Sequence, residues 1–220
     1  MSSIRYRNLG CSAFIVGAVT AAAYLALRPR LLRLGASDEE VTRHMPSDEG
    51  VPNPNYVTNR AVSLEATATD VWPWLAQIGE SPRGGFYSYV WVERLMGMKV
   101  SNADSILPEY QHPRIGDVMD GKGTMTVRGV DEGHWIALGP PESSDLWLST
   151  VWTLAVYDDG PGRTRLVSRV RARVKRWSPS SALVMAIMEP GQLIMERKMF
   201  AEIKRRVDHP STVPRTSTAT

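Results

Sequence analysis

Three acidic residues lie among aromatic residues in the middle of the chain, where they could take part in acid–base chemistry. They are Glu93, Asp104 and Glu109, and Tyr87 and Tyr89 closely precede them in the sequence. A carboxylate that is buried near a tyrosine has a raised pKa and can act as a general base. We therefore take the three carboxylates as candidate catalytic residues. The alternative is structural, because such residues also cap helices and pair with neighbouring arginines.

Other reactive groups are scarce in this sequence. The four histidines are dispersed without any paired ligand spacing, and the single cysteine, Cys11, allows neither an intrachain disulfide nor a cysteine zinc site. No Gly-x-Ser-x-Gly elbow, Walker loop or dinucleotide-binding glycine motif occurs. We therefore expect no metal and no cofactor, and serine hydrolysis and nucleotide chemistry lose their usual support.

Aromatic residues and methionines offer a different kind of site, one that binds an apolar ligand. Methionine adapts its shape to varied apolar surfaces, and aromatic rings supply large apolar area. The same residues also fill ordinary cores, so both interpretations stay open. The candidate ligand-binding residues are Tyr87, Tyr89, Trp91, Trp135, Trp152, Met195 and Met199.

A long strand is predicted from residue 163 to residue 176, with a basic face and an apolar face. Arg165, Arg169 and Arg171 alternate with apolar or small residues such as Leu166 and Val170. Because side chains at period two point to opposite faces, we expect the basic face to turn outward and the apolar face to pack inward. The arginines lack interleaved aromatic residues, so we expect no nucleic acid partner.

Charge is distributed unevenly along the chain, although the net charge is only +3. Residues 34–162 hold eight Lys/Arg against nineteen Asp/Glu, whereas residues 163–206 hold twelve against three. One interpretation is a solvated basic sheet face that acidic loops balance. The other is a basic surface that favours an anionic partner such as lipid headgroups.

The last predicted element is a helix whose apolar stripe includes Met195, Met199 and Ile203. Glu189-Pro190-Gly191 stands inside this segment, and proline removes a backbone donor while glycine adds flexibility. We therefore predict a break there and a working helix from about Gln192. The preceding residues, 180–188, would then form either a mobile lid or a structural turn.

The order of the other elements follows from alternation and turn residues. Residues 60–66 predict a strand, a capped helix begins after Thr67 or Thr69, and residues 88–98 predict a second short helix. Gly and Asp at three turns then separate a predicted antiparallel meander. Its strands are expected near residues 115–119, 123–130, 134–138, 147–157 and 163–176.

The N-terminal region predicts a membrane anchor. Residues 9–27 carry no charge, and arginines flank them on both sides, which suits a single membrane-spanning helix. A cleaved signal peptide is the competing interpretation, and the side of the membrane on which the rest lies is undecided. We divide the chain into an anchor with basic flanks (1–33), a linker with a helical turn from Ser37 (34–56), a folded domain (57–207) and a disordered tail (208–220).

This order of elements resembles the SRPBCC superfamily of START-like and polyketide cyclase-like helix-grip domains. The resemblance covers about residues 57–207. It implies an α+β fold in which a curved antiparallel sheet wraps around a long C-terminal helix, with a ligand cavity between them. The residues that carry the resemblance are 66–75, 85–89, Trp91, Glu93, Ala103, Asp104, Ile106, Pro108, Glu109, Gly116, Asp117 and 195–199.

Three functions follow as expectations. The first is membrane-anchored binding, with transport as an extension, of a hydrophobic ligand such as a lipid or a polyketide-like molecule. The second is a cyclase- or dehydratase-type enzyme that uses one of the candidate carboxylates with Tyr87 or Tyr89. The third is a non-catalytic envelope scaffold whose interior is filled by its own side chains. The resemblance is specific for fold and not for activity, so the site must decide among them.

Overall fold

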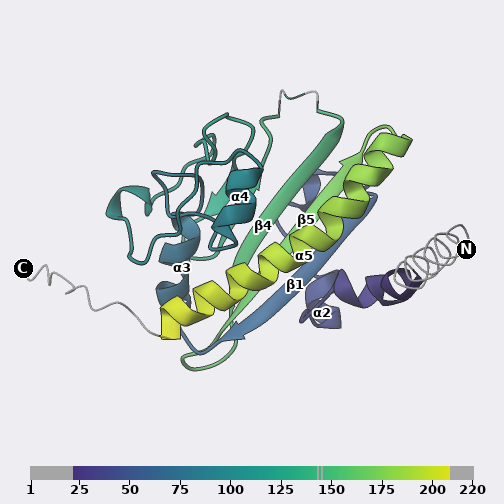
Figure 1. Cartoon of the computed structure of the whole chain (residues 1–220). Helices are drawn as coiled ribbons and strands as arrows, with labels where there is room; N and C mark the ends of the chain where they lie inside the picture. Colours follow the sequence, from purple (N-terminus) through teal and green to yellow (C-terminus); the bar gives the residue numbers. More distant parts are fainter. Residues whose placement is uncertain (1–21, 143, 145, 209–220) are drawn as a thin grey trace, which may run out of the picture.

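The computed structural model describes residues 22–142, 144 and 146–208, and within them the chain forms one antiparallel sheet crossed by a long helix (Figure 1). The sheet has five strands in the order β1-β5-β4-β3-β2. This arrangement confirms the predicted α+β class and agrees with a helix-grip architecture. The strands are β1 (Tyr56–Leu64), β2 (Thr126–Asp131), β3 (Trp135–Gly139), β4 (Leu148–Asp158) and β5 (Thr164–Val174).

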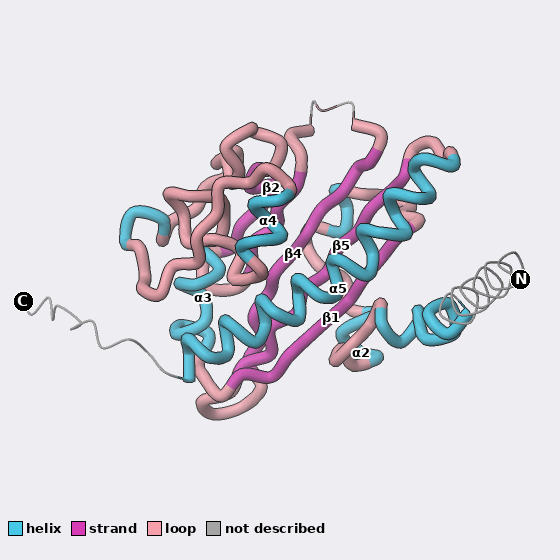
Figure 2. The backbone as a smooth tube through the Cα atoms, viewed as in Figure 1, coloured by secondary structure: helices cyan, strands magenta, loops and turns pink. Residues whose placement is uncertain are grey.

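The helix that crosses the sheet is α5 (Pro179–Asp208), and it is continuous. The predicted break at Glu189-Pro190-Gly191 is therefore wrong. Pro190 lies inside the helix, and a Cβ placed on Gly191 would meet nothing within 4 Å, so neither residue forces the chain to turn. Figure 2 shows α5 as one uninterrupted helix along the whole length of β5 and β1.

Short helices and long loops join the first strand to the rest of the sheet (Figure 2). They confirm the two predicted helices with shorter bounds, but the predicted strand near 115–119 is wrong, since only an isolated bridge joins Val118 to Thr126. Phe86, Val100 and Met119 of these loops pack into the main core together with Met199 of α5. The short elements are α3 (Ala68–Ala76), α4 (Val90–Leu95) and the 3-10 turn η2 (Pro108–Tyr110).

The two faces of β5 separate as the alternation predicts. Ser168 Oγ bonds to Glu196 on α5, whereas Arg169 bonds to Asp48 on the opposite side of the sheet. We call the side facing α5 the inner face and the other side the outer face. The basic side of β5 thus turns outward, as expected. The middle of this side is not solvated, however, because Arg169 is only 2% exposed, whereas Arg173 near the end of the strand is exposed.

Residues 34–56, which were predicted to be a linker, pack on the outer face. They contain α2 (Asp38–Thr42) and the 3-10 turn η1 (Asp48–Gly50), and Ser37 forms the capping box that begins α2. Asp48 pairs with Arg169 at 2.8 Å, and Glu40 pairs with Arg165 at 2.8 Å. The acidic residues that balance the basic strand face therefore come from this segment.

The predicted membrane span, residues 9–27, lies mostly outside the described residues, as does the predicted tail after Asp208. Residues 22–31 are helical, and residues 32–34 then run along the free edge of β1, where Asn59 N donates to Leu32 O at 2.8 Å. Among residues 22–142, 144 and 146–208, no helix is both long enough and apolar enough to cross a membrane.

Candidate functional site

The buried side of α5 is polar in its middle and apolar toward its C-terminal end. Glu189, Gln192 and Glu196 follow one another at spacings of three and four, which places them on one side of the helix. This side faces β1, since Tyr56 Oη donates to Gln192 Oε1 at 2.8 Å and Arg60 Nη1 donates to Glu196 Oε2. Met199 and Ile203 continue the same stripe into the core.

Arg60 on β1 and Glu196 on α5 form an ion pair between the sheet and the helix. Both residues are buried, and Ser168 on the neighbouring strand donates to the second oxygen of the Glu196 carboxylate. Ser168 in turn accepts from Trp152 Nε1 at 2.9 Å. Burial raises the pKa of Glu196, and the charge of Arg60 and the hydrogen bonds oppose that shift. The network ties three strands to α5 through charge-assisted bonds.

The hydroxyl of Thr58 lies beside this network and has no hydrogen-bond partner among the described residues. Thr58 is fully buried, and it pairs with Val170 across the sheet, on the same inner face as Arg60. The surrounding cluster is apolar. It comprises Tyr56, Val170 and Ala172, with Leu32, Leu148, Trp152 and Met185 packed against it. An uncompensated hydroxyl in such a place costs about 1–3 kcal/mol, so this position favours a bound hydrogen-bonding group.

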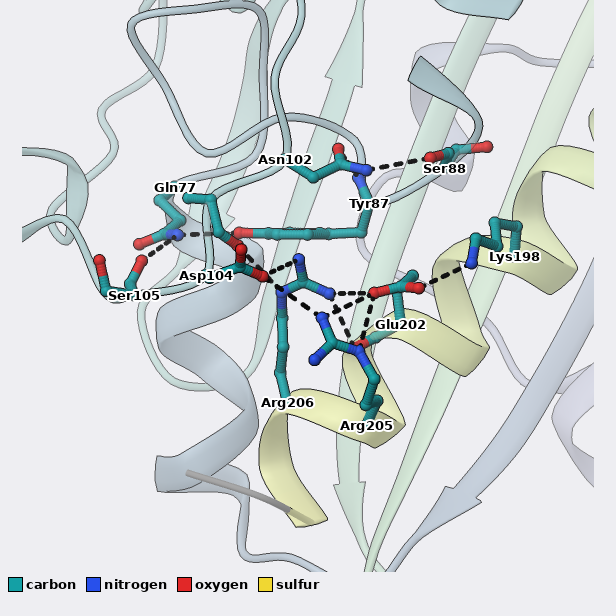
Figure 3. A network of polar contacts seen from close by, with 11 residues as sticks. Gln77, Tyr87, Ser88, Asn102, Asp104, Ser105, Lys198, Glu202, Arg205 and Arg206 are labelled. Atoms are coloured by element: carbon teal, nitrogen blue, oxygen red, sulfur yellow. Dashed lines mark hydrogen bonds and ion pairs between the residues drawn. The ribbon is translucent and has the colours of Figure 1, made fainter. Parts of the chain in front are cut away.

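A second polar network lies at the C-terminal end of α5 (Figure 3). The guanidinium of Arg206 lies against the ring of Tyr87, 4.9 Å from its centroid, and donates to Asp104 at 3.0 Å and to Glu202. Burial alone would raise the pKa of Glu202. Hydrogen bonds from Lys198, Arg206 and Arg205 outweigh this effect and lower its pKa to about 2. This network joins α5 to the loop around Asp104.

Tyr87 is a core residue, and its hydroxyl is not exposed to solvent. Its side chain is fully buried, it packs edge-to-face on Trp74, and Gln77 Nε2 donates to its hydroxyl at 2.9 Å. Burial raises the pKa of this hydroxyl further above its usual value. Its positive φ of 55° is fixed by Asn102, whose side-chain oxygen accepts from the Tyr87 backbone N–H at 2.9 Å.

The three candidate carboxylates lie in different environments and do not form one site. Asp104 and Glu109 are exposed, and Asp104 pairs with Arg205 and Arg206. Glu93 is 2% exposed, and its Oε2 atom has no hydrogen-bond partner among the described residues. Burial raises the pKa of Glu93 to about 7. Glu93 therefore has the raised pKa that acid–base chemistry requires.

The candidate apolar residues differ in the face of the sheet on which they lie and in how exposed they are. Trp135 is on the outer face, where it packs against the cluster around Val51, so it does not face α5. Trp91 is 69% exposed on α4, and it lines no enclosed site. Tyr89 is 37% exposed, beside Lys198.

Three other candidates contact the interior of the domain: Trp152 and Met199 lie between the sheet and α5, and Met195 lies against Ser88. Trp152 is on the inner face, bonded to Ser168 and 6.5 Å from the ring of Phe86. The sulfur of Met195 accepts from Ser88 Oγ at 3.2 Å, and Met199 is part of the core. The structure therefore places Trp152, Met195 and Met199 in the interior of the domain beside α5.

Sequence reasoning missed the residues that the structure gathers most closely. Glu196 was not among the candidate residues, and Arg60 was predicted only as the beginning of a strand. The spacing of Glu189, Gln192 and Glu196 in register with Met199 was the signal that could have placed the acid inside. No sequence signal identified Thr58.

Two surface hollows stand out in the described part of the chain, with volumes of about 320 and about 600 Å³. Both lie on the outer side or edge of the sheet, the smaller one near Glu49 and Thr150 and the larger one near Glu40 and Tyr157. Neither of these two hollows is lined by α5.

No protein-family model matches the chain, and no curated protein does either. Solved structures match at low similarity. A START superfamily protein from Mycobacterium smegmatis is 13% identical, over 69% of this chain and 97% of that one, with a TM-score of 0.42.

Two further solved structures are similar to this chain. One is the di-domain ARO/CYC BexL from the BE-7585A biosynthetic pathway, at 12% identity over 70% of this chain and 46% of that one, with a TM-score of 0.41. The other is norcoclaurine synthase from Thalictrum flavum, at 19% identity over 71% of this chain and 88% of that one, with a TM-score of 0.38. Similarity at this level identifies no function, and the fold rests on the strands and helices described above.

Proposed function

We propose that this chain is a membrane-anchored binding protein that holds a hydrophobic molecule between the inner face of the sheet and α5. The observation that carries the proposal is the buried, unpartnered hydroxyl of Thr58 within an apolar cluster. A ligand that suits this position is apolar over most of its surface and carries at least one hydrogen-bonding group. Lipids and polyketide-like molecules both have this chemistry.

Access to the proposed site requires the N-terminal half of α5 to move away from the sheet. Within residues 179–188 only Ser181 is buried, and Met185 is the one member that packs against the inner cluster around Val170. A segment with so few buried contacts opens at low free-energy cost. The C-terminal half of α5 stays fixed, since Met199, Phe200 and Ile203 lie in the main core.

The test begins with the full chain extracted in detergent and examined by mass spectrometry for co-purifying organic molecules. After delipidation, binding of a fluorescent apolar probe is measured for the wild type and for Thr58→Val, which removes the hydroxyl and keeps the shape. We expect the probe to bind the wild type, and the co-purified molecule to displace it several-fold less well from Thr58→Val. Thr153→Val, at a buried position on the outer face, is the matched control and should bind normally.

If the delipidated chain binds neither a lipid nor the probe, the binding proposal is refuted and the scaffold function is favoured instead. The burial of Met199, Phe200 and Ile203 of α5 in the main core is the observation that supports the scaffold. Equal displacement from Thr58→Val and the wild type would place the ligand elsewhere.

The membrane anchor is a separate part of the proposal and rests on residues 9–27. Nineteen uncharged residues between flanking arginines have the length and composition of a spanning helix. Full-length protein should stay in the membrane fraction after alkaline carbonate washing. Protease treatment of sealed vesicles would then show on which side the folded domain lies. Release by carbonate would refute the anchor without affecting the ligand site.

A cyclase- or dehydratase-type enzyme is the second candidate function, and Glu93 is the residue that supports it. This carboxyl is buried, lacks a partner on one oxygen among the described residues, and has a pKa of about 7, close to that of an effective general base. If mass spectrometry identifies a ligand, turnover of that molecule by the wild type and by Glu93→Gln tests the enzyme. Glu109→Gln, at an exposed carboxylate, is the control.

A further inference from the structure

The N-terminal half of α5 presents apolar side chains to the solvent. Between Pro179 and Met195 the sequence contains a single charged residue, Glu189, and that residue is buried. The exposed apolar side chains of this half are Leu183 (63%), Val184 (41%), Ile187 (64%), Met188 (53%) and Ile194 (56%). A helix on the surface of a soluble domain normally places charged and polar residues there.

This apolar stripe is confined to one half of one helix. Leu183, Ile187 and Ile194 are separated by four and seven residues, so they align along the side of α5 opposite to Glu189 and Glu196. Beyond Glu196 the outward side becomes charged, with Arg197 and Arg205 exposed. The stripe therefore ends where the helix passes over the well-packed core.

The N-terminal segment of the chain is attached to this same half of α5. Arg28 donates to both carboxylate oxygens of Glu189, at 2.7 and 2.8 Å, and Tyr24 Oη donates to it at 2.6 Å. These two residues stand at the end of the uncharged run of residues 9–27. In Figure 1 the start of α5 and the described N-terminal helix lie on the same side of the molecule. The point where the run ends is thus fixed to the half of α5 that carries the apolar stripe, on the opposite side of the helix from the stripe.

Residues suited to a lipid headgroup region precede the stripe. Lys175, Arg176 and Trp177 are all exposed and directly precede the first turns of α5. Tryptophan is enriched at membrane–water interfaces, and basic residues are attracted to anionic lipids. Basic residues also follow the uncharged run, at Arg28 and Arg30. Apolar surface bordered by an aromatic residue and by positive charge complements an anionic bilayer.

We propose that Trp177 and the apolar stripe of α5 dock on the surface of an anionic lipid bilayer, beside the point where the chain leaves the membrane. The inference uses the proposed anchor only to bring the domain to the bilayer. Docking would place the half of α5 that must move for ligand exchange in contact with lipid, so that a hydrophobic ligand need not cross water. The bilayer would then be the partner of the exposed apolar stripe, which ligand binding between helix and sheet does not explain.

The test places a fluorophore at single positions of the full chain. Cys11→Ser removes the one native thiol, and Ile187→Cys then carries an environment-sensitive NBD group. The protein is reconstituted into vesicles of phosphatidylcholine and phosphatidylglycerol, with or without lipids that carry a nitroxide quencher in the acyl chain. We expect a blue-shifted emission and at least twofold quenching at position 187. Arg197→Cys, exposed on the same helix beyond the stripe, is the matched control and should stay unquenched.

Each outcome separates docking from the anchor. A carbonate-resistant chain whose label at 187 is not quenched refutes docking and keeps the anchor. Quenching at 187 in a chain that carbonate releases supports docking and refutes the anchor. A label that is shielded without lipid quenching, and that transfers energy to a second labelled copy, would show a protein partner and overturn the proposal. Quenching should weaken several-fold in Leu183→Ser/Ile194→Ser, whose folding is checked independently by circular dichroism.

Discussion

Arg60 on β1 and Glu196 on α5 form an ion pair between the sheet and the helix, and their side chains are only 2% and 5% exposed. The alternation of the strands predicts apolar packing toward the helix, yet here the helix is held by opposite charges. The pair also fixes the N-terminal segment, because Arg60 Nε donates to the backbone oxygen of Leu31 at 3.1 Å. One arginine thus joins the sheet, the helix and the segment that leads to the predicted anchor.

Breaking this pair on one side should destabilise the fold strongly. Removing one partner leaves an uncompensated buried charge, which costs about 3–5 kcal/mol. We expect Arg60→Met or Glu196→Leu alone to lower the free energy of unfolding by that amount, measured by urea unfolding with tryptophan fluorescence. The double variant should lose less than either single variant, because it leaves no unpaired charge.

An exposed pair on the same helix provides the control for this experiment. Lys204 and Asp208 are 3.7 Å apart, with side chains 44% and 31% exposed. Lys204→Met should change the unfolding free energy by less than about 1 kcal/mol. A double variant at Arg60 and Glu196 whose loss equals the sum of the two single losses would contradict the assigned coupling.

A second prediction compares two arginines on the same face of β5. Arg169 is buried, and its guanidinium donates to Asn59, to Asp48 and to three backbone oxygens of residues 40–43. Arg173 is exposed and donates to the backbone oxygen of Asn53 at 3.2 Å. Arg169→Met should lower the unfolding free energy by about 3–5 kcal/mol, because it removes the closer of the two arginines that pair with buried Asp48 and leaves Arg171 at 3.7 Å.

Arg173→Met should change the unfolding free energy by about 0.5 kcal/mol or less, as exposed substitutions do. The comparison also tests whether residues 34–56 belong to the folded unit, since they supply most of the acceptors of Arg169. Equal effects of the two substitutions would show that this segment does not hold the sheet in solution.

Alternation predicted the sheet well because it is a local property of the strand. Leu166 and Val170 do face α5, and Arg165 and Arg169 do face away. What alternation could not show was what covers the outer face. The segment around Asp48 looked like a linker because it is short of apolar residues, but its acids neutralise buried arginines. Such long-range charge pairing leaves no periodic signal in the sequence.

The candidate site was predicted less well, for reasons of register. Trp135 and Trp152 have similar sequence surroundings, but their positions in the pleat place them on opposite faces of the sheet. The assignment requires the register of β3 against β4, which only pairing reveals. Glu196 was not considered as a buried residue, because charged residues usually lie at the surface. The exception needed a partner, Arg60, that is 136 residues away in the sequence.

The third prediction concerns pH and Glu93. Its pKa rises from 4.5 to about 7 on burial, so the folded state binds a proton that the unfolded state releases. Stability should therefore fall as the pH rises from about 4.5 to about 7, by up to about 3 kcal/mol. Glu93→Gln is neutral at every pH and should remove this loss. We expect the variant to be more stable than the wild type at pH 8 and similar to it at pH 4.5.

Urea unfolding of both proteins at a series of pH values provides the measurement for Glu93. Glu109→Gln is the matched control, because Glu109 is exposed and its replacement should leave the pH dependence unchanged. A Glu93→Gln protein that loses stability at pH 8 would mean that the carboxylate is paired in solution. That result would also remove the support that Glu93 gives to the enzymatic function.

The fourth prediction concerns the middle of α5, where the structure and the sequence pattern disagree. A helix interior favours alanine over glycine by about 1 kcal/mol, and a Cβ at Gly191 would meet nothing within 4 Å. Gly191→Ala should therefore raise the unfolding free energy by about 1 kcal/mol if α5 is continuous. It should also slow the exchange of a bound apolar probe, because a stiffer helix hinders opening of its N-terminal half.

Gly129→Ala is the steric control. Its Cβ would lie 2.9 Å from the ring of Trp135, so this substitution should destabilise the protein. Loss of stability in Gly191→Ala would instead show that the helix is interrupted at Pro190 and Gly191, as the sequence alone predicts.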